Sequence, residues 1–302
     1  MSHLTLAASE QAFEELFKLA RDGFTFAPPP GSASFGPFSA SYSVALHLDK
    51  GSIQLNDDGT IEIDALDVVW DTLTLQVCFD FPGFTIPGFC IIPDPWNGCL
   101  VGIPDIPIGG PICIPLNLSG LVSEISKVRA HLKAKYFIDP GRLPGWTDLQ
   151  AEFAGKPNKW QIFVDPDFVS VDPVDVPATI GNLFENLVKQ AIEDLLPSWL
   201  PGEVKDLLMA FLQPVVDIVM AVLDVFDSVE DFLQDLIGEQ FDLLGQIETA
   251  VADYFANKYP IYEFEDPYPI LTDGPLIPVK IPLRNLNANV NSKEMIITGD
   301  IG

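Results

Sequence analysis

Residues 38–48 read FSASYSVALHL, a stretch in which larger apolar residues alternate with small or polar ones. Alternation with a period of two places every second side chain on the same face of an extended strand. We therefore expect a long β-strand here, with one face buried and the other open to solvent.

The same period continues to residue 81, but its phase changes twice. Apolar residues occupy odd positions at Ile61, Ile63 and Ala65, even positions at Leu66, Val68 and Trp70, and odd positions again at Leu73, Leu75 and Val77. A change of phase turns the apolar set to the other face unless a bulge or a bend absorbs it. With a hairpin turn at Asp57-Asp58-Gly59, residues 36–81 are predicted to form long, curved antiparallel strands, and the sheet is expected to extend to residue 170 through a strand over 127–138.

Helical periodicity marks two other parts of the chain. Phe13, Leu16, Phe17 and Ala20 follow helical spacing, which predicts a helix over residues 5–22, within an N-terminal unit 1–26. Residues 178–257 are predicted to be helical, with one apolar stripe from Val215 to Phe255 that lasts about eleven turns. Strands return over 258–302. We expect one α+β domain over 1–302, a long curved antiparallel β-sheet wrapped around long amphipathic helices.

Charge excludes one class of partner. The 302 residues contain 43 Asp and Glu against 16 Lys and Arg, a net charge of −27, yet the mean hydropathy is +0.25. Proteins that bind nucleic acid neutralise phosphates with basic side chains, so we expect no nucleic-acid partner.

The first residues lack a basic segment followed by a long apolar one, and no stretch reads as a membrane-spanning helix. We therefore expect a cytoplasmic protein or one exported by a non-standard route.

Catalytic patterns are not evident. The chain has three histidines, and it contains no HExxH, P-loop, dinucleotide-binding GxGxxG or GxSxG pattern. His47 and His131 fall inside predicted strands. We expect a protein that is not an enzyme and assign it no catalytic residue, no cofactor and no metal.

The four cysteines, Cys78, Cys90, Cys99 and Cys113, are nested. Paired positions in an antiparallel hairpin have a nearly constant sum, and these pairs match that rule if Cys78 faces Cys113 and Cys90 faces Cys99. This predicts a hairpin folded about Asp94-Pro95-Trp96-Asn97, with two disulfides in an oxidising compartment. A four-cysteine zinc site and four buried free thiols are the alternatives.

The hairpin 78–116 is mostly apolar and rich in proline and glycine. Between residues 82 and 116 only Asp94 and Asp105 carry charge. Phe84, Phe89 and Trp96 are among too many large apolar residues to face solvent together on a monomer. The hairpin is expected to cover the core, to line or gate an apolar cavity, or to contact a membrane peripherally.

A basic stripe is the second localised feature. Lys127, Arg129, Lys133 and Lys135 occupy odd positions of one predicted strand, so they share a face. They form either a solvated face paired with carboxylates or a shallow anion site for lipid head groups.

These elements together resemble the tubular lipid-binding superfamily, the fold of bactericidal/permeability-increasing protein and of the clostridial P-47 proteins. The resemblance is carried by the bulged strands 36–81, the strand 127–138, the stripe 215–255 and the closing segments 283–290 and 295–297. It implies curved strands around an apolar helix, with lipid acyl chains lying in the groove between them.

The most direct interpretation is a non-enzymatic protein that binds or transfers a lipid or another long apolar ligand. The expected ligand-binding residues are Val44, Leu46, Val68, Trp70, Leu75 and Val77 on the sheet, Val222, Phe226, Phe232 and Phe241 on the helices, and the hairpin residues named above. One alternative is a component of a toxin or secreted assembly whose amphipathic helices interact with membranes or partner subunits. Another is a plain structural or interaction domain. The sequence does not fix the oligomeric state.

Overall fold

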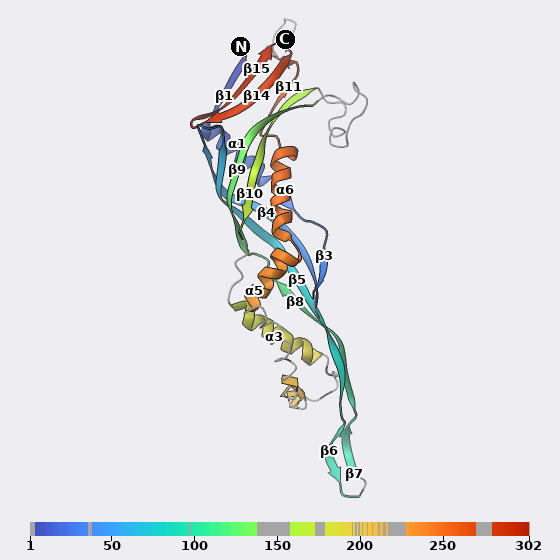
Figure 1. The fold of residues 1–302 in the computed structure, drawn as a ribbon. Coiled ribbons are helices and arrows are strands. Elements are labelled where there is room, and N and C mark those ends of the chain that lie inside the picture. The colour runs from blue at the N-terminus through green and yellow to red at the C-terminus, as the bar shows by residue number, and fades with distance from the viewer. Residues whose placement is uncertain are drawn as a thin grey trace.

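The computed structural model describes residues 4–35, 38–96, 98–137, 158–172, 179–194, 228–269 and 280–301, with scattered positions between 196 and 216. It has an α+β fold in which a large antiparallel sheet packs against helices. The molecule is elongated, with both chain ends at one pole and a β-hairpin at the other (Figure 1).

Within the described residues, the main sheet has eight strands. Its order is β11 (Tyr262–Glu265), β10 (Lys159–Val171), β9 (Val122–Phe137), β5 (Ile61–Ile86), β4 (Phe38–Leu55) and β2 (Thr25–Phe26). Two further strands pair outside this path, β3 (Gly31–Phe35) with β4 and β8 (Ile106–Asn117) with β5. Strand β5 is 26 residues long and pairs first with β9 and then with β8, so it runs through both the body and the hairpin.

Of the two predicted phase changes in β5, the first is a local bend and the second is a bulge. Ala65 has a positive φ of 53°, and the register with β4 and β9 is the same on both sides of it. Asp71 is the extra residue where Ala45 pairs with Thr72 and Leu46 with Trp70. The bend and the bulge return each apolar run to the same face, and the predicted hairpin turn is confirmed by Gly59, which has a φ of 86°.

The N-terminal prediction was partly wrong. Leu4–Ser9 forms strand β1, and the helix α1 covers only Glu10–Asp22. Leu4, Leu6 and Ala8 alternate, which suits a strand paired with β15 (Glu294–Ile301). The Ser9 hydroxyl then accepts a hydrogen bond from the Ala12 N–H at 3.3 Å, which caps α1. Strand β14 (Leu283–Asn291) completes this three-stranded sheet.

The helical layer is more divided than the apolar stripe suggested. Its described helices are α3 (Thr179–Asp194), α5 (Val229–Asp235) and α6 (Leu243–Asp253), and π-helical segments follow α5 at 236–240 and α6 at 254–258. Asp242 has a φ of 50°, the left-handed region, and separates the first π-helical segment from α6. The stripe is therefore interrupted by a backbone break, and residues 217–227 of it lie outside the described residues.

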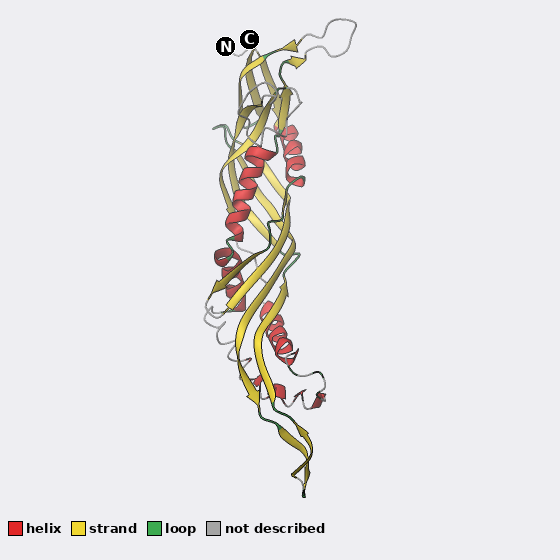
Figure 2. Cartoon of the chain, turned by 90° about the vertical axis from the view of Figure 1, so that its right-hand side faces the viewer, coloured by secondary structure: helices red, strands yellow, loops and turns green. Residues whose placement is uncertain are grey.

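The core lies between the helices and one face of the curved sheet (Figure 2). Phe13, Phe17 and Ala20 of α1 are buried there, and the Phe17 ring stacks on Phe255 with centroids 5.8 Å apart. Two short ladders complete the fold: β12 (Tyr268–Pro269) pairs with β13 (Lys280–Ile281), and β6 (Phe89–Asp94) pairs with β7 (Gly98–Ile103).

Candidate functional site

An apolar seam runs between the main sheet and the helices. We define the seam as the contact of the inner face of β4 and β5 with α5, α6 and the π-helical segment between them. On the sheet side the structure buries all six predicted residues, Val44, Leu46, Val68, Trp70, Leu75 and Val77. They come from alternate positions of two strands, which is why the period-two pattern identified them.

The helix side of the seam contributes aromatic rings. The ring centroids of Phe232 and Phe38 are 6.1 Å apart, and those of Phe241 and Tyr42 are 4.6 Å apart. Both phenylalanines were predicted to face the sheet, and both are buried. Val222 and Phe226 lie outside the described residues.

Polar groups along the seam pair with one another. The Trp70 indole Nε1–H donates to the Ser123 hydroxyl at 2.9 Å, and both side chains are buried. The Gln246 amide donates to the Phe241 carbonyl at 2.9 Å. These pairs leave the seam lining largely apolar, as a site for a hydrocarbon chain requires.

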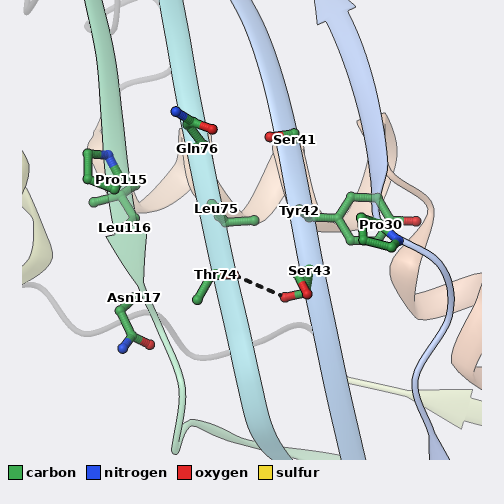
Figure 3. Close-up of a pocket in the computed structure, with 10 residues that line it drawn as sticks. All are labelled: Pro30, Ser41, Tyr42, Ser43, Thr74, Leu75, Gln76, Pro115, Leu116 and Asn117. Atoms are coloured by element: carbon green, nitrogen blue, oxygen red, sulfur yellow. Dashed lines mark hydrogen bonds between the residues drawn. The ribbon is translucent and has the colours of Figure 1, made fainter.

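A hollow of about 670 Å³ lies against β4, β5 and β8. Figure 3 shows Ser41 and Ser43 beside Thr74 and Gln76. These four residues alternate along β4 and β5 with the buried seam residues, so they belong to the other face of the sheet. Its lining is uncharged: Pro30, Ser41, Tyr42, Ser43, Thr74, Leu75, Gln76, Pro115, Leu116 and Asn117. Sequence reasoning missed it, because outward polar positions of a strand resemble any solvated face.

The basic stripe is paired with acids of the same chain. Lys127 lies 3.1 Å from Glu62, Arg129 3.5 Å from Asp58, and Lys133 2.8 Å from Asp165, measured between the charged atoms. This is the first of the two alternatives, a solvated face paired with carboxylates. A head-group anion would have to compete with these carboxylates.

Lys135 differs from its neighbours on the stripe. Its ammonium donates to the Ala256 carbonyl at 2.7 Å and to the Asn257 amide oxygen at 2.6 Å, and it lies 4.8 Å from the centre of the Phe163 ring. Burial lowers the pKa of this ammonium. Lys135 thus holds the π-helical segment 254–258 against the sheet.

Two histidines have carboxylate partners. His47 Nδ1 lies 2.8 Å from an oxygen of Asp71, and His131 Nδ1 lies 2.5 Å from an oxygen of Asp167. Within the described part of the chain, neither ring has a hydroxyl or thiol as its hydrogen-bond partner.

The four cysteines form the two predicted disulfides. Cys78 is bonded to Cys113 and Cys90 to Cys99, with Cα atoms 4.0 and 5.7 Å apart. The nested spacing therefore identified the pairing correctly, and the zinc-site and free-thiol alternatives are wrong. We call residues 78–116 the hairpin arm, which is held near its base by one bond and near its tip by the other.

The hairpin arm ends in a tight turn at the predicted position. Trp96 is 89% exposed there, and Leu100 in β7 is 69% exposed. The Asp94 carboxylate accepts a hydrogen bond from the Trp96 N–H at 2.9 Å. This contact is an Asx turn, which an Asp two residues before the donor favours. The side chains of Phe84 and Phe89 lie outside the described residues.

A comparison with protein-family models and a comparison with curated proteins each found no match for the chain. Among the helices that the structure describes, none combines the length and the apolar character needed to cross a bilayer.

Proposed function

We propose that the protein binds or transfers a lipid or another long apolar ligand without catalysing a reaction, and that the hydrocarbon part of the ligand lies along the seam. One observation carries this proposal: both sides of the seam are apolar, from the Phe38–Phe232 contact to the Tyr42–Phe241 contact and beyond. Burying a hydrocarbon chain contributes about 0.8 kcal/mol for each CH₂ group.

The helical layer supports the proposal because a backbone break divides it into segments that are able to move separately. The Asp242 break separates α6 from α5 and its π-helical extension. A ligand can enter by displacing α5 and its extension while α6 stays on β10. The ligand's CH₂ groups would then replace the contacts that Phe232 and Phe241 make with β4.

The same arrangement, curved antiparallel strands around apolar helices, underlies the resemblance to the tubular lipid-binding superfamily, and we include membership in the proposal. The two disulfides support an oxidising compartment as the place of action.

Native mass spectrometry of the purified protein, followed by organic extraction, tests the proposal. We expect an added mass of lipid size that is lost on denaturation. A fatty acid with a photoactivatable diazirine should then cross-link to peptides of β4, β5, α5 and α6.

A bare protein mass, no lipid in the extract and no cross-link to these peptides would overturn the proposal. The alternative, a membrane-active component of an assembly, predicts leakage of dye from vesicles, which simple lipid binding does not produce.

A further inference from the structure

The hairpin arm projects from the body of the molecule. Beyond residue 86 its strands leave the main sheet, and β6 pairs only with β7 in the described part of the chain. Figures 1 and 2 both show this end well clear of α3 and α5. Its tip is therefore a narrow, two-stranded projection at one pole.

The tip presents apolar side chains to solvent. Trp96 and Leu100 have the two highest exposed fractions among the large apolar side chains of the described residues. They lie four positions apart, in the turn and in the strand that follows it. Exposed apolar side chains that gather at one place mark a contact surface.

The tip offers no charge to attract an anionic partner. The sequence contains no Lys or Arg from residue 51 to residue 126. The two acids of the segment 82–116 both serve its backbone: Asp94 accepts from the Trp96 N–H, and Asp105 accepts from the Gly88 N–H at 2.6 Å. The rest of the chain carries most of the net charge of −27, which repels anionic surfaces.

We propose that the tip of the hairpin arm is an interfacial anchor, which inserts Trp96 and Leu100 into the head-group region of a bilayer without net charge. An indole, apolar with a single N–H donor, suits that region of a membrane. A stable protein interface buries about 800 Å² on each partner, more than a two-stranded tip offers, whereas a bilayer requires no matching shape.

The Cys90–Cys99 bond supports this role. It joins β6 to β7 close to the turn, with nine residues of sequence separation, so the tip keeps one shape before it meets the membrane. A contact that is already ordered loses less conformational entropy on binding. The anchor acts independently of the seam, so this inference goes beyond the proposed function.

Flotation with phosphatidylcholine vesicles tests the anchor in the full chain. The unmodified protein should float with the vesicles, and less of it should float as phosphatidylglycerol replaces phosphatidylcholine. Trp96→Ser and Leu100→Ser should each lower the partition coefficient about tenfold, since each removes most of one buried apolar side chain. Leu19→Ser is the matched control, because Leu19 is 62% exposed on α1, away from the arm, and it should bind as the unmodified protein does.

Insertion itself has a separate readout. Phosphatidylcholine with brominated acyl chains should quench part of the tryptophan fluorescence, and Trp96→Phe should abolish that part. Absence of flotation, equal binding by Trp96→Ser, or equal loss in Leu19→Ser would each overturn the anchor. If Trp96→Ser and the unmodified protein sediment differently without vesicles, the tip would instead be a contact between two copies of the chain. Trp96→Ser should keep the lipid seen by native mass spectrometry, so the seam and the anchor can fail separately.

Discussion

At the scale of single residues, Tyr254 connects the π-helical segment 254–258 to α1 and to Phe24, which lies between α1 and β2. Its hydroxyl donates to the Ala20 carbonyl at the end of α1, at 3.1 Å, and its ring packs edge-on against Phe24 with centroids 5.1 Å apart. Burial, and secondarily the nearby Tyr259, raises the pKa of Tyr254 to about 12. The folded state therefore favours the neutral phenol.

This pKa predicts a specific alkaline instability. The contribution of Tyr254 is fully present below its ordinary pKa of 10.0 and is lost as the pH rises toward about 12, because the unfolded chain releases the proton first. We expect the stability advantage of the unmodified protein over Tyr254→Phe to shrink across this window in urea titrations. Tyr262→Phe, at an exposed tyrosine, is the control, and an advantage that stays constant with pH would contradict the prediction.

Ala65 gives a second residue-level prediction. Its positive φ is strained for a side chain with a Cβ and costs about 1 kcal/mol, which glycine avoids. We expect Ala65→Gly to raise the free energy of unfolding by up to about 1 kcal/mol in urea titrations. Ala45→Gly in β4, outside the positive-φ set, should lower it instead, and destabilisation by both changes would rule out strain at Ala65.

At the scale of elements, the two disulfides close loops of different length. Their sequence separations are 35 for Cys78–Cys113 and 9 for Cys90–Cys99. The chain-entropy model then predicts that losing the longer loop costs about 1 kcal/mol more than losing the shorter one. Paired Cys→Ser variants, one for each bond, provide the comparison by urea unfolding, and equal losses would show that strain or residual structure dominates.

The strands were more predictable than the helices, for a physical reason. A change of phase in a strand exposes apolar side chains unless the backbone bends or bulges there, so the sequence predicted the neighbourhoods of the bend at Ala65 and of the bulge at Asp71. A helix can break at Asp242 while its apolar stripe continues, because residues on both sides still face the sheet. Strand β1 was misassigned because its partner β15 lies at the far end of the sequence, and no local pattern reports that pairing.

The candidate site also has features that the sequence predicts and features that it does not. The inward positions of β4 and β5 and the cysteine pairing follow from local periodicity and spacing. The hollow beside Thr74 and Gln76 and the clamp from Lys135 to Ala256 depend on three-dimensional neighbours, so no sequence pattern pointed to them.

At the scale of the whole molecule, negative charges far outnumber positive ones. With a net charge of −27 and only 16 basic residues, repulsion among carboxylates opposes the compact state more than the surface ion pairs of the basic stripe favour it. We expect the melting temperature to rise as NaCl screens this repulsion. KCl should act equally, and a melting temperature that falls with either salt would show that the ion pairs outweigh the repulsion.

The pairing of β1 with β15 sets how the protein responds to mechanical load. Leu4 faces Gly299, so force applied at Leu4 and Ile301 pulls two neighbouring antiparallel strands apart from the same end. The load then falls on one pair of hydrogen bonds at a time, as in a zipper, rather than on the whole ladder in shear. The pole that carries both strand ends is thus mechanically soft and can peel open under a small force, while the disulfide-braced arm at the opposite pole keeps its shape.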